Sequence, residues 1–467
     1  MRFSLHRKKQ TSNGAWVVAA DMGYGHYRAA LPLQKIAFRR TLINANDYPG
    51  IPFSDKLIWH ESRRLYEVIS RFKKFPILGD FVFGIFDKFQ AIQEFYPREQ
   101  SIDSPTLQLK QVYALMEKRK WGKHLIQKLN QNPLPFVTTF FVLASMAEYW
   151  GYSGPVYLII PDTDVSRAWA PLRPSQSKIR YCVPTQRVAE RLKRYGVEEQ
   201  NIFYTGFPLP EEFTSSNAFR AKQDLKRRLT RLDPNCKYRM SYSKIIKQYV
   251  GALPTVKLKP RPFSITFAIG GAGVQEEIAE KIMESVSPLL KTKRIVCTVI
   301  AGMDTRITAS LHHNAKEHGV SSFLGKNLFI RSALHKKEYF KEFARILHAT
   351  DILWTKPSEL VFYAGLGIPL LIAPPVGSQE VCNRRWLLKI GAGIDQMNPA
   401  FTHQWLPDLI EEGVFAEAAL QGFIKIEKRG TENIAALINS YIPTFVPSSP
   451  KDSEGHSKTT AGKRTNS

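Results

Sequence analysis

Short runs of apolar residues recur along the chain, and each is followed by a turn and a longer stretch with helical periodicity. Runs that are apolar at nearly every position are typical of parallel strands buried on both faces. In the first part of the chain they span residues 15–20, 134–143, 156–160, 180–183 and 201–204. In the second part they span residues 264–269, 294–300, 327–331, 352–354 and 369–373. This alternation predicts an α/β fold with two doubly wound halves.

The same pattern divides the chain into segments. The first half ends in a turn that contains Pro208 and Pro210. The last residues are rich in Ser, Thr, Lys, Gly and Pro, a composition typical of disorder. We therefore expect a basic extension at 1–14, a first domain at 15–210, a basic connector at 211–262, a second domain at 263–400, C-terminal helices at 401–445 and a disordered tail at 446–467.

A glycine-rich turn follows the first strand. Its sequence, DMGYGH at 21–26, leads into a helix that we expect to reach about Ala37. Gly23 and Gly25 allow the backbone to approach a ligand closely, and a helix N-terminus attracts anions. The turn matches neither the dinucleotide fingerprint nor the P-loop, which argues against an ordinary NAD or ATP site. His26 stands at the start of this helix, where it is either a structural histidine or a general base.

A second glycine-rich turn opens the second half. Gly270, Gly271, Ala272 and Gly273 follow the strand at 264–269 and precede a predicted helix at 275–290. Backbone N–H groups in such a turn, together with the helix N-terminus, can hold a diphosphate. The alternative is a tight turn between a strand and a helix with no ligand.

Polar side chains gather after the strands at 352–354 and 369–373. In an open α/β sheet, ligands bind outside the carboxyl ends of the strands. Ser358 can cap a helix that ends at Gly367, and a polar loop at 378–380 precedes the next helix. The polar residues at these two strand ends are Thr355, Lys356, Ser358, Glu359, Gln379, Glu380 and Asn383. They predict a binding site, whereas the alternative is an ordinary βαβ unit with solvated loops.

Two acids follow the strand at 156–160. Asp162 and Asp164 have a spacing that can hold a divalent metal beside nucleotide phosphates. That spacing is common by chance, and we expect no metal there. The carboxylates can instead orient His26 or replace it as the base.

Charge and composition bear on partners and compartment. The 467 residues carry a formal net charge of +25, which favours anionic partners such as nucleotide phosphates, anionic lipid or nucleic acid. Thirteen Lys or Arg but two acids lie between Arg220 and Arg261, either in a solvated helix and linker or on a surface that meets phosphate groups. The four cysteines are far apart, which fits a reducing cytoplasm and argues against a zinc site. With no apolar run of 18 residues and no secretory signal pattern, we expect no membrane span.

Residues 56–95 differ from the rest of the chain. They combine many Phe residues with Arg and Lys beside the apolar positions. Such a segment suits a membrane surface. It can equally pack on its own domain or on a second chain.

The motifs, taken in order, resemble the two-domain GT-B glycosyltransferases, and within them the group of MurG and the monogalactosyl- and diglucosyl-diacylglycerol synthases. The resemblance covers about residues 15–395. The motifs that carry it are the turn at 23–26, the acidic stretch at 159–162, the strand at 181–185, the turn at 206–208, the glycines at 270–271, and the polar groups at 355–356, 367–369, 378–380 and 383. Phe362 stands where the family has its ribose-binding glutamate, and Glu359 is the chemical substitute.

The resemblance implies two Rossmann-like domains that face a cleft, with the acceptor bound by the first and the donor by the second. It implies metal-independent, inverting transfer of a sugar, without a cofactor, from a UDP-sugar to a lipid or lipid-like hydroxyl. His26 would be the base, assisted by Asp162 or Asp164, with Gly23 and Gly25 on the acceptor side. Gly270, Gly271, Ala272, Gly273, Thr355, Lys356 and Ser358 would hold the diphosphate, Glu359 the ribose, and Gln379, Glu380 and Asn383 the sugar. Such an enzyme would be cytoplasmic, with a peripheral position on the inner face of the membrane.

Two other functions are compatible with the sequence. The same scaffold supports sugar-nucleotide epimerases, which need no membrane-facing segment. A non-catalytic basic protein could bind nucleic acid or membranes through 220–261, although no nucleic-acid-binding module is recognisable and we expect no specific nucleic acid.

Overall fold

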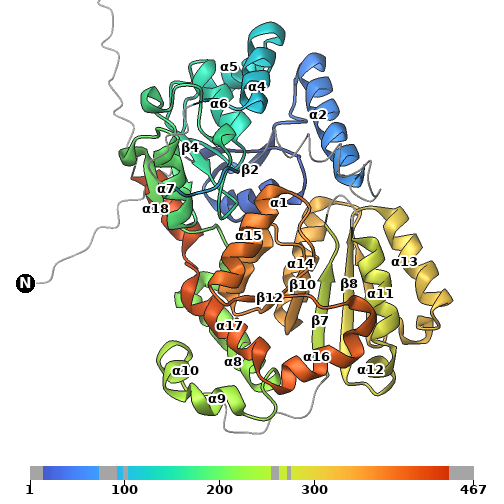
Figure 1. Cartoon of the computed structure of the whole chain (residues 1–467). Helices are drawn as coiled ribbons and strands as arrows, with labels where there is room; N and C mark the ends of the chain where they lie inside the picture. The colour runs from blue at the N-terminus through green and yellow to red at the C-terminus, as the bar shows by residue number, and fades with distance from the viewer. Residues whose placement is uncertain (1–13, 73–91, 98–103, 254–261, 271–274, 441–467) are drawn as a thin grey trace, which may run out of the picture.

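The structure, a computed structural model, describes residues 14–72, 92–97, 104–253, 262–270 and 275–440, and these form two stacked α/β halves (Figure 1). Each half contains a six-stranded, fully parallel sheet flanked by helices. The prediction of two Rossmann-like, doubly wound halves is confirmed.

The first sheet has the strand order β2-β1-β3-β4-β5-β6. Its strands are β1 (Ala15–Ala19), β2 (Ala37–Asn44), β3 (Phe136–Thr138), β4 (Val156–Ile159), β5 (Arg180–Val183) and β6 (Ile202–Tyr204). The chain winds outward in one direction from β1 to β2 and in the other from β3 to β6. The order therefore reverses between β1 and β3, and the carboxyl ends of these two strands meet at a topological switch point.

The second sheet has the order β12-β11-β10-β7-β8-β9. Its strands are β7 (Phe263–Ala268), β8 (Ile295–Gly302), β9 (Leu328–Ser332), β10 (Ile352–Thr355), β11 (Leu370–Ile372) and β12 (Gly393–Asp395). Counted from β7, this is the strand order of a dinucleotide-binding sheet, and its switch point lies between β7 and β10.

The helices cover both sheets. Those of the first half are α1 (Tyr24–Ala30), α2 (Phe53–Phe72), α4 (Leu107–Arg119), α5 (Lys123–Asn130), α6 (Phe141–Tyr149) and α7 (Gln186–Arg194). Those of the second half are α8 (Glu211–Arg231), α9 (Lys237–Ser241), α10 (Ser243–Val250), α11 (Glu276–Ser285), α12 (Ser287–Lys291), α13 (Thr305–Glu317), α14 (Lys336–Ala349), α15 (Ser378–Lys389), α16 (Thr402–Glu411) and α17 (Val414–Lys425). A 3₁₀ helix, η6 (Glu359–Leu366), connects β10 to β11.

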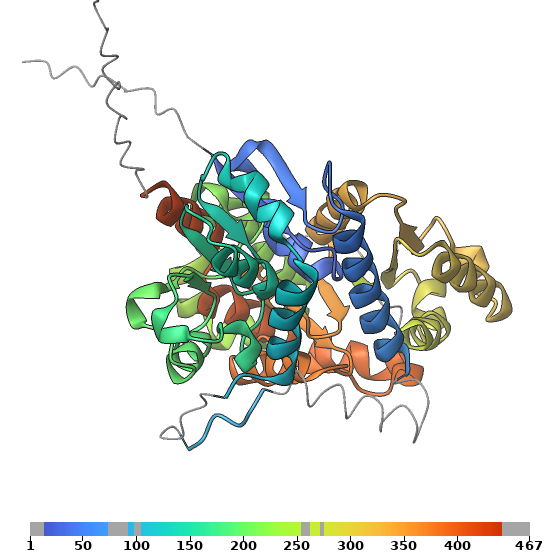
Figure 2. The same ribbon diagram turned by 90° about the horizontal axis from the view of Figure 1, so that it is seen from above.

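The last helix, α18 (Gly430–Asn439), returns to the first half. Its Ile434 and Ile438 are buried in a cluster with Val17 of β1 and Val137 of β3. Both views show α18 beside the first half, apart from the other C-terminal helices (Figures 1 and 2). The chain thus crosses between the halves twice, once after β6 and once before α18.

Three local predictions were wrong. The apolar run at 134–143 is not one strand, because β3 covers only Phe136–Thr138 and α6 begins at Phe141. Residues 141–147 are buried throughout, and a fully buried helix has no polar face to show its period. The first helix ends at Ala30, and β2 then forms an edge strand from Ala37. The predicted loop at 378–380 is the first turn of α15.

The basic connector is partly internal. Phe213, Leu225 and Leu229 of α8 lie in the core of the second half. The side chain of Arg228 is only 1% exposed, so α8 is not the solvated helix that its charge suggested. The domain boundaries themselves stay a prediction.

Some predictions fall outside the described residues. These are the N-terminal extension up to residue 13, residues 73–91 of the Phe-rich segment, Gly271, Ala272 and Gly273, and the tail at 446–467. Among the helices that the structure does describe, none has the length and hydropathy to cross a bilayer.

Candidate functional site

The two switch points hold most of the predicted site residues. The turn that carries Gly23, Gly25 and His26 follows β1, and Thr139 follows the neighbouring β3. In the second half, Gly270 follows β7, and Lys356 follows the neighbouring β10. Ligands of doubly wound sheets bind at such points. Contacts between the two halves join these groups into one site.

His26 is oriented by the first half. Its Nδ1 lies 2.8 Å from the carbonyl oxygen of Thr139, and a carbonyl can only accept, so Nδ1 carries the hydrogen and Nε2 a free lone pair. Thr139 Oγ1 in turn donates to the carbonyl of His26 at 2.8 Å. Burial lowers the pKa of His26, while this hydrogen bond and the charge of Glu359 oppose the shift. His26 is therefore a neutral imidazole near pH 7, the form that can accept a proton.

Glu359 lies between the halves. Its carboxylate pairs with Arg28 of α1, and the two side chains are 9% and 5% exposed. Nη2 of Arg28 also donates to the hydroxyl of Tyr339 at 3.3 Å, and the guanidinium carbon lies 4.6 Å from the ring centroid of Phe343. A Cβ at Gly25 would lie 2.7 Å from Oε2 of Glu359, so a larger residue at this position would displace the carboxylate. The predicted ribose ligand thus has a cationic partner from the first half.

Asn383 also joins the halves. Its Nδ2 donates to Oδ1 of Asp162 at 3.0 Å. Its Oδ1 accepts from the N–H and the hydroxyl of Thr163, at 2.9 and 2.8 Å. Asn383 is fully buried, and these bonds use the amide that was predicted to contact the sugar. In the structure it binds the loop after β4, and its contact with a sugar stays a prediction.

The carboxyl of Asp162 has an unusual environment. Burial raises its pKa to about 7, the bond from Asn383 opposes this rise, and the charges of Glu359 and Glu380 add to it. A carboxyl with this pKa is half protonated near neutral pH and can both take and give a proton.

Lys356, Glu380 and Gly270 form the donor side. Lys356 pairs with Glu380, whose other oxygen accepts from the N–H of Val376 at 2.8 Å. A Cβ at Gly270 would lie 2.6 Å from Cε of Lys356. The lysine is therefore held beside the second glycine turn, where a diphosphate would need a cation.

Other predicted residues lie in less open positions. Asp164 receives two bonds of 2.8 Å from Arg191, one to each carboxylate oxygen, and is buried, so it fixes α7 on the sheet. Thr355 Oγ1 is buried and lies 3.4 Å from the carbonyl of Ala268. Ser358 precedes η6 without a capping bond from its side chain, and Gln379 lies in the first turn of α15.

Sequence reasoning missed Arg28, Thr139, Thr163 and Tyr24. The hydroxyl of Tyr24 accepts from the N–H of Met303 at 3.0 Å, which makes another contact between the halves. Arg28 and Tyr24 flank His26 in a segment already singled out, so their position was a signal. Their partners, hundreds of residues away, were not.

In the part of the chain that the structure describes, no group of three His, Cys, Asp or Glu side chains is arranged to hold a metal ion. Asp162, Glu359 and Glu380 are each engaged with Asn383, Arg28 or Lys356. The site as a whole joins a neutral imidazole, a carboxyl of raised pKa and two cations.

Comparison with known proteins gives a family model and several solved structures. The model of a domain of unknown function (DUF6938) matches residues 256–413, less than half of the chain. A search of curated proteins finds no match.

MurG from Acinetobacter baumannii is similar over 92% of this chain and 100% of its own, with 13% identity and a TM-score of 0.47. S. aureus MnaA, in a structure with UDP, is similar over 92% of this chain and 96% of its own, with 13% identity and a TM-score of 0.48. UDP-GlcNAc 2-epimerase from Neisseria meningitidis, bound to UDP-GlcNAc, is similar over 78% and 88%, with 12% identity and a TM-score of 0.42. The fold assignment rests on the two sheets themselves.

Proposed function

We propose that the protein is a glycosyltransferase that moves a sugar from a nucleoside diphosphate sugar, UDP-linked, to a hydroxyl of a lipid or lipid-like acceptor. The observation that carries this proposal is the tautomer of His26. Its Nδ1–H is fixed on Thr139, which leaves Nε2 as a base at the switch point of the first half. The lipid nature of the acceptor rests on the resemblance of the motifs to the glycolipid synthases.

In this reaction the acceptor oxygen forms a bond to the anomeric carbon, and the bond from that carbon to the diphosphate breaks. Nε2 of His26 takes the proton of the hydroxyl, a role worth about 10² to 10⁴ in rate. The nucleoside diphosphate leaves with the electron pair. Because the base belongs to the first half and the diphosphate to the second, attack comes from the side opposite the leaving group, which inverts the anomeric centre.

The second half stabilises the charge that develops on the diphosphate. Lys356 lies beside Gly270, and we expect it to act there together with backbone N–H groups of the glycine turn predicted at 270–273. Glu359, whose carboxylate is paired with Arg28, would accept from the ribose hydroxyls. No step in this scheme requires a metal or a further cofactor.

The test is nucleotide binding followed by transfer. Saturating a real site at 100 times its dissociation constant stabilises the protein by about 2.7 kcal/mol. We expect UDP and one UDP-sugar to raise the melting temperature more than GDP, ADP or TDP, and a labelled sugar to pass to a lipid acceptor. His26→Gln should keep the UDP shift and lose about 10² or more in kcat. Full turnover of this variant would refute the assignment of the base.

A sugar-nucleotide epimerase is the second candidate. The observation that favours it is Asp162, whose pKa of about 7 suits reversible proton transfer on the sugar itself. An epimerase would change the stereochemistry of a UDP-sugar without any acceptor, whereas a transferase would leave the unreacted donor unchanged. Proton NMR of the nucleotide sugar, incubated with the protein alone, separates the two.

We further propose a cytoplasmic location at the inner face of the membrane. The four cysteines are all free, which suits a reducing compartment. The net charge of +25 favours an anionic surface. A third candidate, a non-catalytic basic protein, would bind nucleic acid with a steep salt dependence and would give no shift with any nucleotide.

A further inference from the structure

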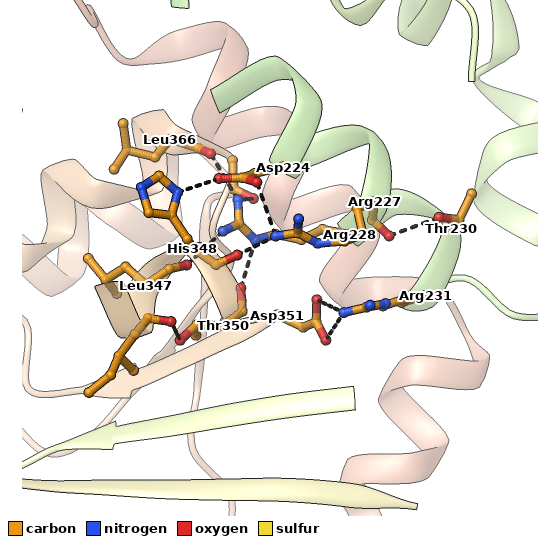
Figure 3. Close-up of polar contacts among 12 residues, drawn as sticks. Asp224, Arg227, Arg228, Thr230, Arg231, Leu347, His348, Thr350, Asp351 and Leu366 are labelled. Carbon is orange, nitrogen blue, oxygen red and sulfur yellow. Dashed lines mark hydrogen bonds and ion pairs between the residues drawn. The ribbon is translucent and has the colours of Figure 1, made fainter. Parts of the chain in front are cut away.

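The basic segment at 220–261 has an inward part and an outward part. On α8, Arg228 donates to the carbonyls of Leu347 and Thr350 at the end of α14 and to that of Leu366 at the end of η6, at 2.8 to 3.1 Å (Figure 3). Arg231 pairs with Asp351 at 3.1 Å on the same side. Arg228 and Arg231 are therefore paired within the protein and do not contribute to a surface for a partner.

The outward part is α9 with α10. Three lysines on these helices, Lys237, Lys244 and Lys247, are exposed. Large apolar side chains are exposed beside them: Met240 (71%), Tyr242 (41%), Ile245 (40%) and Tyr249 (42%). Among the side chains that the structure describes, no other stretch of ten residues exposes more than two large apolar side chains. We call these seven residues the α9–α10 face.

The α9–α10 face is held rigidly. Tyr238, Ile246 and Val250, on the other side of the two helices, are buried in the core that contains Leu225 and Leu229 of α8. Tyr242, Ile245 and Tyr249 follow one another at intervals of three and four residues, so they share one side of the helix. In Figure 1, α9 and α10 form the end of the second half that lies away from the first half. The face is therefore distinct from the site between the halves.

The charged side chains that α9 and α10 themselves expose are all basic, and Glu417 of α17 lies near Tyr238 on the other side of α9. No Asp or Glu occurs between Pro234 and Gln275. Arg239 is paired with the nearest preceding acid, Asp233, at 3.1 Å, and that carboxylate is buried. A second copy of this chain would bring the same positive charge to the face, which opposes self-association.

We propose that the α9–α10 face docks on an anionic lipid bilayer. Tyrosine, methionine and isoleucine side chains can enter the headgroup region, while lysines on the flanks meet the lipid phosphates. The face combines basic side chains with exposed apolar and aromatic ones. This combination fits a bilayer better than nucleic acid, because nucleic acid has no hydrocarbon interior into which apolar side chains can insert. The proposal deepens the membrane location proposed above by assigning a surface to it, and docking itself needs neither nucleotide nor acceptor.

Vesicle flotation of the full chain tests the proposal. We expect binding to phosphatidylcholine vesicles that contain phosphatidylglycerol, and not to phosphatidylcholine alone. Each basic residue near an anionic leaflet changes the binding constant about fivefold, so Lys244→Ser with Lys247→Ser should weaken binding about 30-fold. Met240→Ser with Ile245→Ser should weaken it about tenfold or more.

Matched controls change the same chemistry elsewhere on the second half. Lys291→Ser with Lys326→Ser removes two exposed lysines, and Phe401→Ser removes an exposed aromatic side chain. Both should bind vesicles like the unchanged protein. Far-UV circular dichroism and the UDP-induced thermal shift are measured on every variant. They distinguish a variant that has lost only vesicle binding from one that has lost its fold or its nucleotide binding.

Three outcomes would overturn the proposal. The unchanged protein does not bind anionic vesicles, or it binds them equally well after both pairs of substitutions in the α9–α10 face. The third outcome is that the protein binds a nucleic acid duplex through the lysines of the α9–α10 face and does not bind vesicles. Each of these results stands whether or not the protein transfers a sugar.

Discussion

Asn383 shows how a single residue links the halves to the proton chemistry. Its amide, which the sequence predicts as a sugar ligand, donates to Asp162 and accepts twice from Thr163. The bond to Asp162 is made to the ionised carboxylate and holds its pKa down, against burial. Asn383 is therefore a positioning residue for Asp162, and the pH dependence of the reaction should depend on it.

We expect Asn383→Ala to raise the pKa of Asp162 above its value of about 7, because the amide donor that stabilises the carboxylate is lost. If ionised Asp162 is the working form, the acidic limb of the profile of kcat/KM against pH moves to higher pH. Lys389→Ala, an exposed change on the same helix, should leave the profile in place. An unmoved limb in Asn383→Ala would contradict the link.

The same shift affects stability with a definite sign. The folded-state pKa of Asp162 lies above its ordinary value of 3.8, so between about pH 4 and 7 the folded chain holds a proton that the unfolded chain releases. The contribution of Asp162 to stability therefore falls as pH rises through this window. The sign of this pH dependence is set by the local environment of the carboxyl. The sequence, which shows only that residue 162 is Asp, does not reveal it.

At the scale of elements, Arg228 holds two helix ends together. Its guanidinium satisfies carbonyls at the C-termini of α14 and η6, positions that have no partner within a helix. Because η6 begins with Glu359, this arginine also supports the site from a distance. Figure 3 shows the guanidinium surrounded by these groups, with Asp224 and His348 beside it.

Replacing Arg228 by methionine should destabilise the protein by about 3–5 kcal/mol, because several buried carbonyls lose their donor at once. Arg220→Met, an exposed change on the same helix, should stay within about 0.5 kcal/mol. Urea unfolding followed by tryptophan fluorescence measures both. Equal stability of the two variants would show that water replaces the arginine.

Most elements of the second half were predicted from the sequence, because β7, β8, β10 and β11 are short apolar runs between turns. The failures have physical causes. The helix α6 has no polar face, and β2 is an edge strand whose Arg39, Arg40 and Thr41 are exposed, so neither shows its period. At the site, strand ends indicated Gly25 with Glu359 and Lys356 with Glu380, and the structure places the two members of each pair close together.

At the scale of the whole molecule, the ion pair of Arg28 with Glu359 joins the halves. Its partners are 331 residues apart, so the sequence could identify Glu359 as a polar group at a strand end but not its cation. Both side chains are buried, and a buried charge without its partner is costly. The pair therefore couples the alignment of the halves to the integrity of the site.

Arg28→Ala should destabilise the protein by about 3–5 kcal/mol, whereas the double change Arg28→Met with Glu359→Leu should recover much of this loss. Arg345→Ala breaks an exposed pair with Glu342 and should cost about 1 kcal/mol or less. Thermal unfolding compares the three variants. A double variant no more stable than Arg28→Ala would show that the arginine acts through Tyr339 and Phe343 and not through the ion pair.

The position of α18 has a consequence for synthesis on the ribosome. The last described helix covers Val17 and Val137 of the first sheet, although residues 205–429, nearly half of the chain, lie between β6 and that helix in the order of translation. The ribosome adds about 5–20 residues per second. The surface of the first sheet that carries Val17 and Val137 therefore stays without α18 for about 10–50 s after β6 is made. During that interval the nascent first domain presents an apolar surface, and this makes it a natural client for a chaperone at the ribosome.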